Sequence, residues 1–184
     1  MILILIVSLI AAGPTAVSAG DPYADIQAMR SAFAQIHSAI AIERFSSGGV
    51  ATVAYSAPNR FRVTTPQSEI VLAGNVEYGR HNGGKWVETS QGAQHQVLLT
   101  AVWQLAGPPS VDLHKLFAIT PIGTKTYRGA ILRGYALHEV DGAYDETLWI
   151  AADNLPASAQ ISMPGQTVEI RYSDYNTGVL IATP

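Results

Sequence analysis

The stretch "APNRFRVTTPQSEIVLAGNVEYGR", residues 57–80, indicates the class of fold. In its first half, apolar and polar side chains alternate along an extended chain, so Phe61 points one way while Arg60 and Arg62 point the other. In its second half, the run from Ile70 to Ala73 places apolar groups on both sides. The alternation predicts β-strands, and the run predicts that something covers the second face of the sheet.

The same period of two recurs along most of the chain and predicts a series of short strands. They are expected at 38–45, 50–57, 60–65, 69–73, 76–80 and 85–89, and again at 124–127, 130–140, 146–152, 158–163, 167–173 and 179–182. Turns rich in Gly, Pro and Asn separate them. Because the connections are short, consecutive strands should pair as an antiparallel meander.

Two parts of the chain have helical spacing instead. Asp21 and Pro22 suit a helix start, and an apolar stripe follows at Ile26, Met29, Phe33 and Ile36. A helical insert is expected between Gln94 and Ala118. Its first part carries a wide stripe, ended by Gly107-Pro108, that consists of Val97, Leu98, Ala101, Val102 and Leu105. Its second part is a short helix, capped by Ser110, that carries Leu113, Leu116 and Phe117.

These elements predict a mainly β (α+β) fold, in which a curved antiparallel sheet forms an open half-barrel. The N-terminal helix and the insert act as its lid. Because a sheet of so many strands curls, and two short helical segments cannot easily seal it, we expect an apolar cavity suited to acyl chains. The expected lining is Ile40, Ile42, Val53, Tyr55, Phe61, Val63, Ile70, Leu72, Trp86, Leu98, Val102, Trp103 and Trp149. The alternative is that these residues are ordinary core.

The N-terminus predicts export. The segment "MILILIVSLI", residues 1–10, is apolar, and Val17 and Ala19 fit the small-residue pattern before a signal-peptidase site. We expect a signal peptide at 1–19 and a single mature domain at 20–184, soluble in the periplasm after cleavage. The alternative is a hydrophobic N-terminal anchor.

Composition narrows the class of partner. The sequence has no cysteine, which excludes disulfides, thiolate ligands and a lipid-modified cysteine, and which suits a periplasmic domain of this size. The net charge of −3 predicts no nucleic-acid partner. Charged residues make up 14%, against about 25% in a typical domain, so the chain has either a large core or an apolar surface reserved for a ligand.

No motif predicts an enzyme, a cofactor or a metal. "GRHNGGK", residues 79–85, has P-loop spacing, but Trp86 stands where Ser or Thr must hold magnesium, so a hairpin turn explains it better. The five histidines lack zinc-ligand spacing, and no Gly-x-Ser-x-Gly elbow occurs. The acidic turn "DGAYDE", residues 141–146, lacks the ligand ladder of a calcium loop and is better explained as a solvated hairpin tip.

Three segments carry a resemblance to known families. "APNRFRV", residues 57–63, resembles the Pro-Asn-x-Phe strand start of the periplasmic lipoprotein carriers, the LolA family. "IVLAGNVEYGRHNGGKW", residues 70–86, resembles the strand and hairpin that follow it there. The tail "LWIAADNLPASAQISMPGQTVEIRYSDYNTGVLIATP", residues 148–184, resembles that family and also the mycobacterial LppX/LprG lipid-binding lipoproteins.

The resemblance implies a LolA-like half-barrel whose apolar hollow carries acyl chains, and a role in transport within the cell envelope. Two departures stand out: Ala57 occupies the position of an Arg tied to lipoprotein handover, and the lipid-modified Cys of the LppX/LprG group is missing. We therefore expect a soluble relative with its own apolar ligand.

Two hypotheses follow. In the first, the protein is a carrier or binding protein for a lipid, an acyl chain or a lipoprotein, with transient contact with a membrane. In the second, it is a non-enzymatic interaction module with a filled core that meets another envelope protein. A cavity lined by carbon favours the first, and a tightly packed interior favours the second.

Cleavage of the signal peptide is directly testable. Because Val17 and Ala19 fit the cleavage site, mature protein from the periplasmic fraction should begin at Gly20 when its N-terminus is sequenced. Protein that begins at Met1 and sediments with membranes would contradict this expectation.

Overall fold

The computed structural model describes residues 20–74, 76–89, 112–140, 142 and 145–184. The predicted signal peptide and the apolar stripe of the predicted insert lie outside these ranges.

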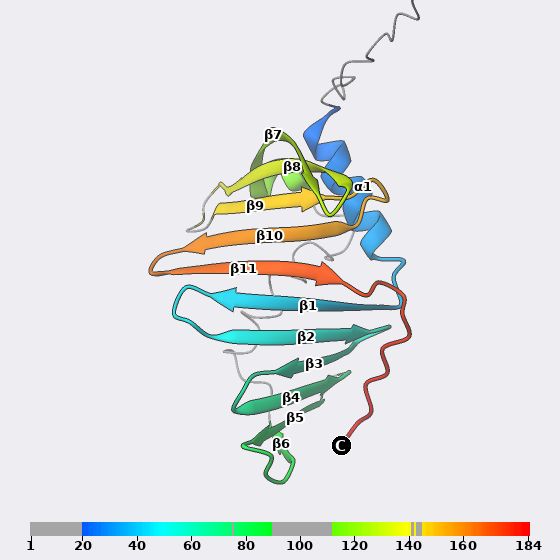
Figure 1. Ribbon diagram of the computed structural model, residues 1–184, viewed down its shortest axis with the longest axis vertical. Coiled ribbons are helices and arrows are strands. Elements are labelled where there is room, and N and C mark those ends of the chain that lie inside the picture. Colours follow the sequence, from blue (N-terminus) through cyan, green and yellow to red (C-terminus); the bar gives the residue numbers. More distant parts are fainter. Residues whose placement is uncertain (1–19, 75, 90–111, 141, 143–144) are drawn as a thin grey trace, which may run out of the picture.

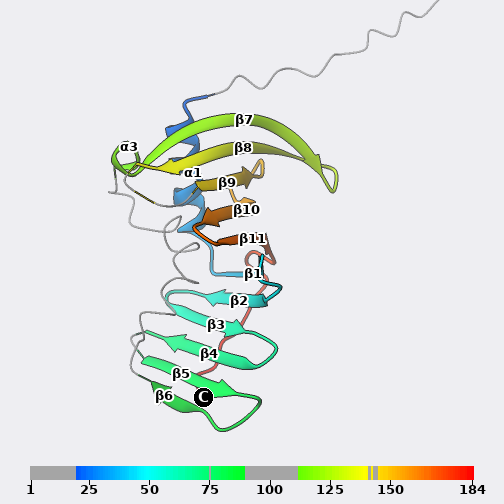
Figure 2. The same cartoon turned by 90° about the vertical axis from the view of Figure 1, so that its left-hand side faces the viewer.

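Within the described residues the chain forms one curved antiparallel sheet of eleven strands, with a helix against one face (Figures 1 and 2). The strands are β1 Ser38–Phe45, β2 Val50–Ser56, β3 Arg60–Thr64, β4 Ser68–Ala73, β5 Val76–His81, β6 Val87–Thr89, β7 Phe117–Tyr127, β8 Ala130–Glu139, β9 Asp145–Ile150, β10 Pro156–Met163 and β11 Gln166–Ser173. The helices are α1 Pro22–Phe33 and the single turn α3 Leu113–Leu116.

The sheet consists of two meanders joined in the middle. Its order is β6-β5-β4-β3-β2-β1-β11-β10-β9-β8-β7, so neighbours along the chain are neighbours in the sheet except where β1 meets β11. That central pair runs from Ile40 opposite Ser173 to Phe45 opposite Val168. The predicted mainly β fold with an antiparallel meander is confirmed.

Helix α1 forms as the sequence predicts. The Asp21 side chain accepts a hydrogen bond from the backbone N–H of Tyr23 at 3.0 Å, and Pro22 occupies the first turn. Asp25 ties the helix to the sheet, because its carboxylate accepts from Arg133 at 2.8 Å and from the Tyr135 hydroxyl at 2.5 Å. The expected stripe of Ile26, Met29, Phe33 and Ile36 is buried, although Ile36 lies beyond the end of the helix.

Strand register separates two faces, since residues that pair across strands point the same way. We call the face that packs with α1 the helix face and the other the outer face. On the helix face Ala41 pairs with Val53, and Val53 with Val63. These residues belong to the same buried cluster as Met29 and Phe33 of α1.

Part of the outer face is covered as well, which accounts for the apolar run of β4. Val71 pairs with Arg62 and Tyr78 on the outer face, and its side chain is fully buried. The segment after β11 runs down the sheet toward β4 and β5 (Figure 1), and Arg60 donates to the carbonyl oxygen of Ile181 at 2.8 Å. The C-terminal segment thus closes over outer-face residues that would otherwise meet water.

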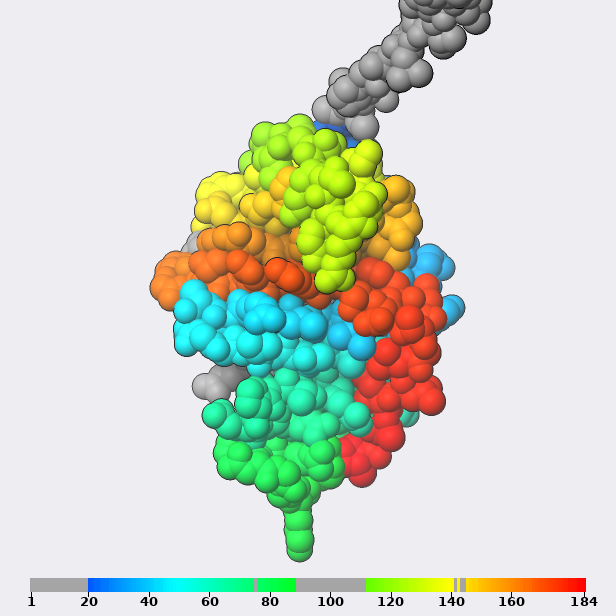
Figure 3. Space-filling view, in the orientation of Figure 1, coloured from blue at the N-terminus to red at the C-terminus, as the bar shows by residue number. Residues whose placement is uncertain are grey.

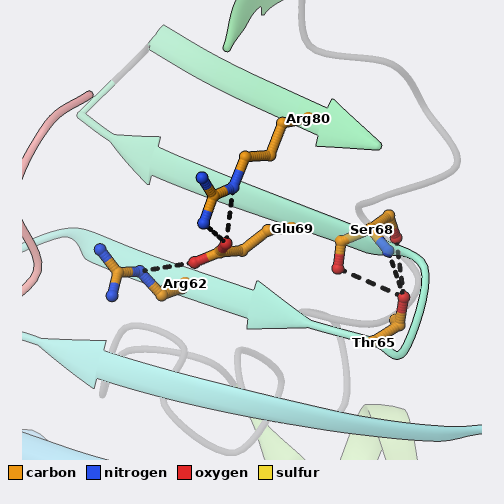
Figure 4. Close-up of polar contacts among 5 residues, drawn as sticks. All are labelled: Arg62, Thr65, Ser68, Glu69 and Arg80. Atoms are coloured by element: carbon orange, nitrogen blue, oxygen red, sulfur yellow. Dashed lines mark hydrogen bonds and ion pairs between the residues drawn. The ribbon is translucent and has the colours of Figure 1, made fainter. Parts of the chain in front are cut away.

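Next to the C-terminal segment, the outer face carries charged side chains. Glu69 of β4 lies between Arg62 of β3 and Arg80 of β5 and forms ion pairs with both (Figure 4). At the adjoining turn, the Thr65 hydroxyl accepts from the backbone N–H of Ser68 at 2.9 Å. These contacts fix the β3–β4 turn and present polar groups to solvent.

Two element predictions need correction. The helix capped by Ser110 was expected to carry Phe117, but α3 is capped by Asp112 and ends at Leu116, and Phe117 begins β7. Phe117 pairs with Glu139 of β8, and this long pairing outweighs helical spacing. The predicted strand at 179–182 is absent, because this segment is held by burial of Ile181 and by Arg60 without strand pairing.

The β7–β8 hairpin arches over the outer face (Figure 2). A register shift between Pro121 and Gly123 bends β7. Gly134 allows the close approach, because a Cβ there would lie 2.6 Å from the Trp149 ring and 2.8 Å from Ile122. The bend carries the end of the hairpin, near Tyr127 and Ala130, in front of β10 and β11 (Figure 3).

The burial pattern predicts where stability resides. Leu148 of β9 is fully buried on the helix face, so Leu148→Ala should lower the free energy of unfolding by about 2–5 kcal/mol. The control Ile131→Ala, at a site 61% exposed, should change it by less than about 0.5 kcal/mol. Urea denaturation followed by circular dichroism measures both, and equal losses would contradict the assigned faces.

Candidate functional site

The helix face carries a continuous apolar surface across β2, β3 and β4. Val53 pairs with Val63 and Tyr55 with Phe61, with the two aromatic rings 5.0 Å apart. On β4, Ile70 pairs with Val63 and Leu72 with Phe61. The structure therefore brings together six of the predicted lining residues on one face: Val53, Tyr55, Phe61, Val63, Ile70 and Leu72.

Ile40 and Ile42 do not belong to this surface, and the expectation that they share it is wrong. They pair with Ala54 and Thr52 on the outer face, where Ile42 is 36% exposed. Strand β1 carries apolar side chains at both its odd-numbered and its even-numbered positions. The alternation therefore does not predict which set of side chains faces the helix. The structure turns its alanines inward, in the same core cluster as α1.

Trp86 and Trp149 also lie apart from this apolar surface. Trp149 is on the outer face, where it pairs with Gly134 and Ser158. The Arg80 guanidinium lies 4.6 Å from the ring centroid of Trp86, and Arg80 is on the outer face opposite Glu69. The other predicted lining residues, Leu98, Val102 and Trp103, lie outside the described residues.

Polar side chains interrupt the helix face at several points, and we call three of them, Glu43, Glu146 and Tyr172, the buried polar cluster. Glu43 lies on β1 opposite Ile170, Glu146 on β9 opposite Ile161, and Tyr172 on β11 opposite Ala41. Their exposed fractions are 1%, 5% and 8%. All three side chains are therefore buried on the helix face of the sheet.

Within the described chain, four side-chain oxygens of the cluster lack hydrogen-bond partners. Both carboxylate oxygens of Glu43, Oε1 of Glu146 and the Tyr172 hydroxyl are buried without one. A buried polar atom left unpaired costs about 1–3 kcal/mol, and most such atoms in proteins are paired. The cluster thus offers hydrogen bonds that a bound molecule could complete.

The acidity of these groups reflects the same burial. Burial raises the pKa of Glu43 to about 7 and that of Glu146 to about 8. It also raises the pKa of Tyr172 well above its ordinary value, with further contributions from the charges of Glu146, Tyr175 and Glu43. At neutral pH a protonated carboxyl can donate a hydrogen bond as well as accept one, which suits a neutral polar group.

Sequence reasoning missed this cluster, although a signal was present. In "AIERF", residues 41–45, the side chain of Glu43 points to the same face of the strand as those of Ala41 and Phe45. If that face packs against the core, Glu43 must be buried with them. Bringing Tyr172 and Glu146 onto the same face depends on the pairing of β1, β11, β10 and β9, which local pattern does not reveal.

The described residues contain no group of three or more His, Asp or Glu side chains arranged to hold a metal. At the predicted acidic hairpin tip, Asp145 is exposed and contacts Nδ1 of His138 at 2.5 Å.

Comparison with solved structures identifies the fold. The chain is similar to the Mycobacterium tuberculosis lipoprotein LppX, with a TM-score of 0.65 at 16% identity over 89% of this chain and 100% of LppX. It is also similar to LprF from Mycobacterium bovis, with a TM-score of 0.55 at 15% identity over 90% of this chain and 99% of LprF. The LolA/LppX-like fold that the sequence resemblance implied is confirmed.

A third neighbour is larger than this chain. MucB has a TM-score of 0.50 at 19% identity over 88% of this chain, and the chain spans 60% of the length of MucB. No protein-family model and no curated protein sequence matches the chain. Among the described residues, no helix is both long enough and apolar enough to cross a membrane.

The raised pKa values predict how stability changes with pH. Because the folded protein retains the protons of Glu43 and Glu146 up to about pH 7 and 8, whereas the unfolded chain releases them near 4.5, stability should fall between pH 5 and 8. The slope should reach about 1.4 kcal/mol per pH unit for each carboxyl. Urea unfolding of delipidated protein at several pH values measures it.

Matched variants show which carboxyl groups cause the pH dependence of the free energy of unfolding. Glu43→Gln and Glu146→Gln should each flatten it, because the amide does not titrate, whereas Glu88→Gln at an exposed site of β6 should leave it unchanged. Stability that stays level or rises from pH 5 to 8 would contradict the assignment.

Proposed function

We propose that the protein is a non-enzymatic periplasmic carrier that binds an acyl-type ligand, a lipid or a lipoprotein acyl group, on its helix face. The observation that carries the proposal is the buried polar cluster, in which Glu43, Glu146 and Tyr172 have buried atoms without partners on a largely apolar face. A core completed by the described residues alone would leave these groups unsatisfied. A ligand with an apolar tail and a neutral polar end satisfies both parts of the face.

The two parts have distinct roles. The apolar surface of β2, β3 and β4, from Val53 to Leu72, would bury the acyl chain, and each methylene removed from water contributes about 0.8 kcal/mol. At the centre of the sheet, the Tyr172 hydroxyl and a protonated Glu43 would donate to an ester or hydroxyl oxygen. The polar end therefore sets the orientation, and the chain supplies most of the affinity.

The structural neighbours fit this proposal. LppX is itself described as a lipoprotein, so this fold occurs in a lipoprotein. At 16% identity this likeness extends to the fold, and the argument for a ligand rests on the residues of the helix face.

A protein partner is the second candidate, and one observation favours it. A structure of the Pseudomonas aeruginosa MucA/MucB complex resembles this chain with a TM-score of 0.50 at 17% identity. A neighbour of this fold thus assembles with another protein. If the helix face is a filled core, an envelope protein is the expected partner instead of a lipid.

A pair of identical substitutions on opposite faces tests the lipid proposal. Ile70→Lys places a charge on the helix face, whereas Ile42→Lys places it at a half-exposed site on the outer face. Wild type should take up a fluorescent fatty acid, Ile70→Lys should weaken that binding by about tenfold or more, and Ile42→Lys should leave it unchanged. Titration by fluorescence, with circular dichroism to check folding, provides the measurement.

The outcomes separate the two candidates. If the wild type binds no apolar probe and Ile70→Lys unfolds the sheet, the helix face is a filled core and the lipid proposal fails. Equal weakening by both lysines would place the probe elsewhere and would also contradict it.

A further inference from the structure

A second site lies on the outer face, away from the proposed acyl surface. Beneath the arch of the β7–β8 hairpin is a pocket of about 200 Å³. Its floor is formed by β9, β10 and β11, and the residue that reaches it from the hairpin is Lys125. We propose that this pocket binds the phosphate group of a polyol phosphate, such as glycerol phosphate or a glycerophosphate lipid headgroup.

The floor consists of two rows of outer-face side chains. Trp149, Ser158 and Arg171 form one row, because Ser158 pairs with both of the others. Thr147, Gln160 and Glu169 form the second row, because Gln160 pairs with its two neighbours in the same way. The floor thus has a cation and an aromatic ring in one row and a carboxylate among hydroxyl and amide groups in the other.

Lys125 and Arg171 both line this pocket, together with the carboxylate of Glu169. Within the described chain neither forms an ion pair. Lys125 rests on Trp149, with its ammonium 3.9 Å from the ring centroid. Burial lowers the pKa of Lys125, and the charge of Arg171 lowers it further, so an anion between the two cations would relieve their repulsion.

The arrangement favours phosphate over carboxylate. The two cations come from different elements, one in the hairpin and one on the floor. A carboxylate has two oxygens and can satisfy the planar guanidinium alone, whereas a phosphate has a further oxygen for the ammonium. Glu169 lies next to Arg171 along β11 in the same pocket, where it would repel a second anion but accept hydrogen bonds from hydroxyl groups.

Size restricts the ligand to a headgroup. The pocket volume of about 200 Å³ is smaller than that of a typical ligand pocket, which is roughly 300–1,000 Å³. The end of the hairpin carries two exposed apolar side chains, Tyr127 at 42% and Ile131 at 61% exposure. These would contact the acyl region if the phosphate belongs to a lipid, and would have no role if it is a free metabolite.

Calorimetric titration of the mature protein with glycerol 3-phosphate tests the site. Wild type should bind saturably, and Lys125→Gln and Arg171→Gln should each weaken binding by about tenfold or more. Arg128→Gln is the matched control, because Arg128 stacks on Tyr127 at the hairpin turn and does not line the pocket. Glu169→Gln should reduce the preference for glycerol 3-phosphate over inorganic phosphate without weakening phosphate binding.

Vesicles distinguish the two sources. Binding to phosphatidylglycerol vesicles but not phosphatidylcholine vesicles, reduced by Tyr127→Ser and Ile131→Ser, indicates a lipid headgroup. Binding to glycerol 3-phosphate alone indicates a free polyol phosphate, and either result supports the site. The proposal is overturned if neither probe binds saturably, or if Arg128→Gln weakens binding as much as Lys125→Gln does. Failure here leaves the acyl ligand of the helix face untouched, since its test uses other residues.

Discussion

The pairing of β1 with β11 is the contact on which the rest of the structure depends. It joins a meander that ends at β6 to one that begins at β7, and so makes a single sheet from segments more than a hundred residues apart. The same register sets Tyr172 beside Ala41 and Ile170 beside Glu43 on the helix face. It also sets Arg171 beside Ile42 on the outer face. Both candidate sites therefore follow from one strand pairing.

A sheet with two differently used faces explains the unusual composition. The chain has few charged residues because the helix face and part of the outer face are both covered. On the helix face, Glu43 and Glu146 occupy buried positions and leave carboxylate oxygens without hydrogen-bond partners. An apolar residue at either position would pack there without this cost. The neutral form that burial favours makes these two carboxyl groups hydrogen-bond donors near pH 7, so they suit an uncharged polar group better than a cation.

Much of the fold could be predicted from local pattern, and the exceptions have physical causes. Phe61 and Val63 alternate with arginines, so their shared face was evident, and the structure confirms it. Ile40 and Ile42 were placed wrongly, because β1 alternates isoleucine with alanine and either phase could face inward. The alanines of β1 face inward and belong to the same buried cluster as α1. The alternation of side chains along one strand gives no information about this tertiary contact.

The candidate sites were harder to predict because they are made by distant segments. The lining of the outer pocket combines Lys125 from a bent hairpin with Arg171 from the last strand. Trp149 was expected in an apolar cavity, yet it supports a lysine on the other face. Gly134 permits the Trp149 ring to lie against the hairpin, because a side chain at position 134 would clash with it. The sequence alone does not show which of its glycines is needed for such a close contact.

Native mass spectrometry of the protein, purified from its native cells without detergent, tests the central claim most directly. The account predicts a stoichiometric adduct of lipid mass that organic solvent removes, and that is reduced in protein carrying Glu43→Gln and Tyr172→Phe together. A bare polypeptide mass in every preparation, with delipidated protein that acquires no lipid on incubation, would contradict the claim that the helix face holds an acyl-type ligand.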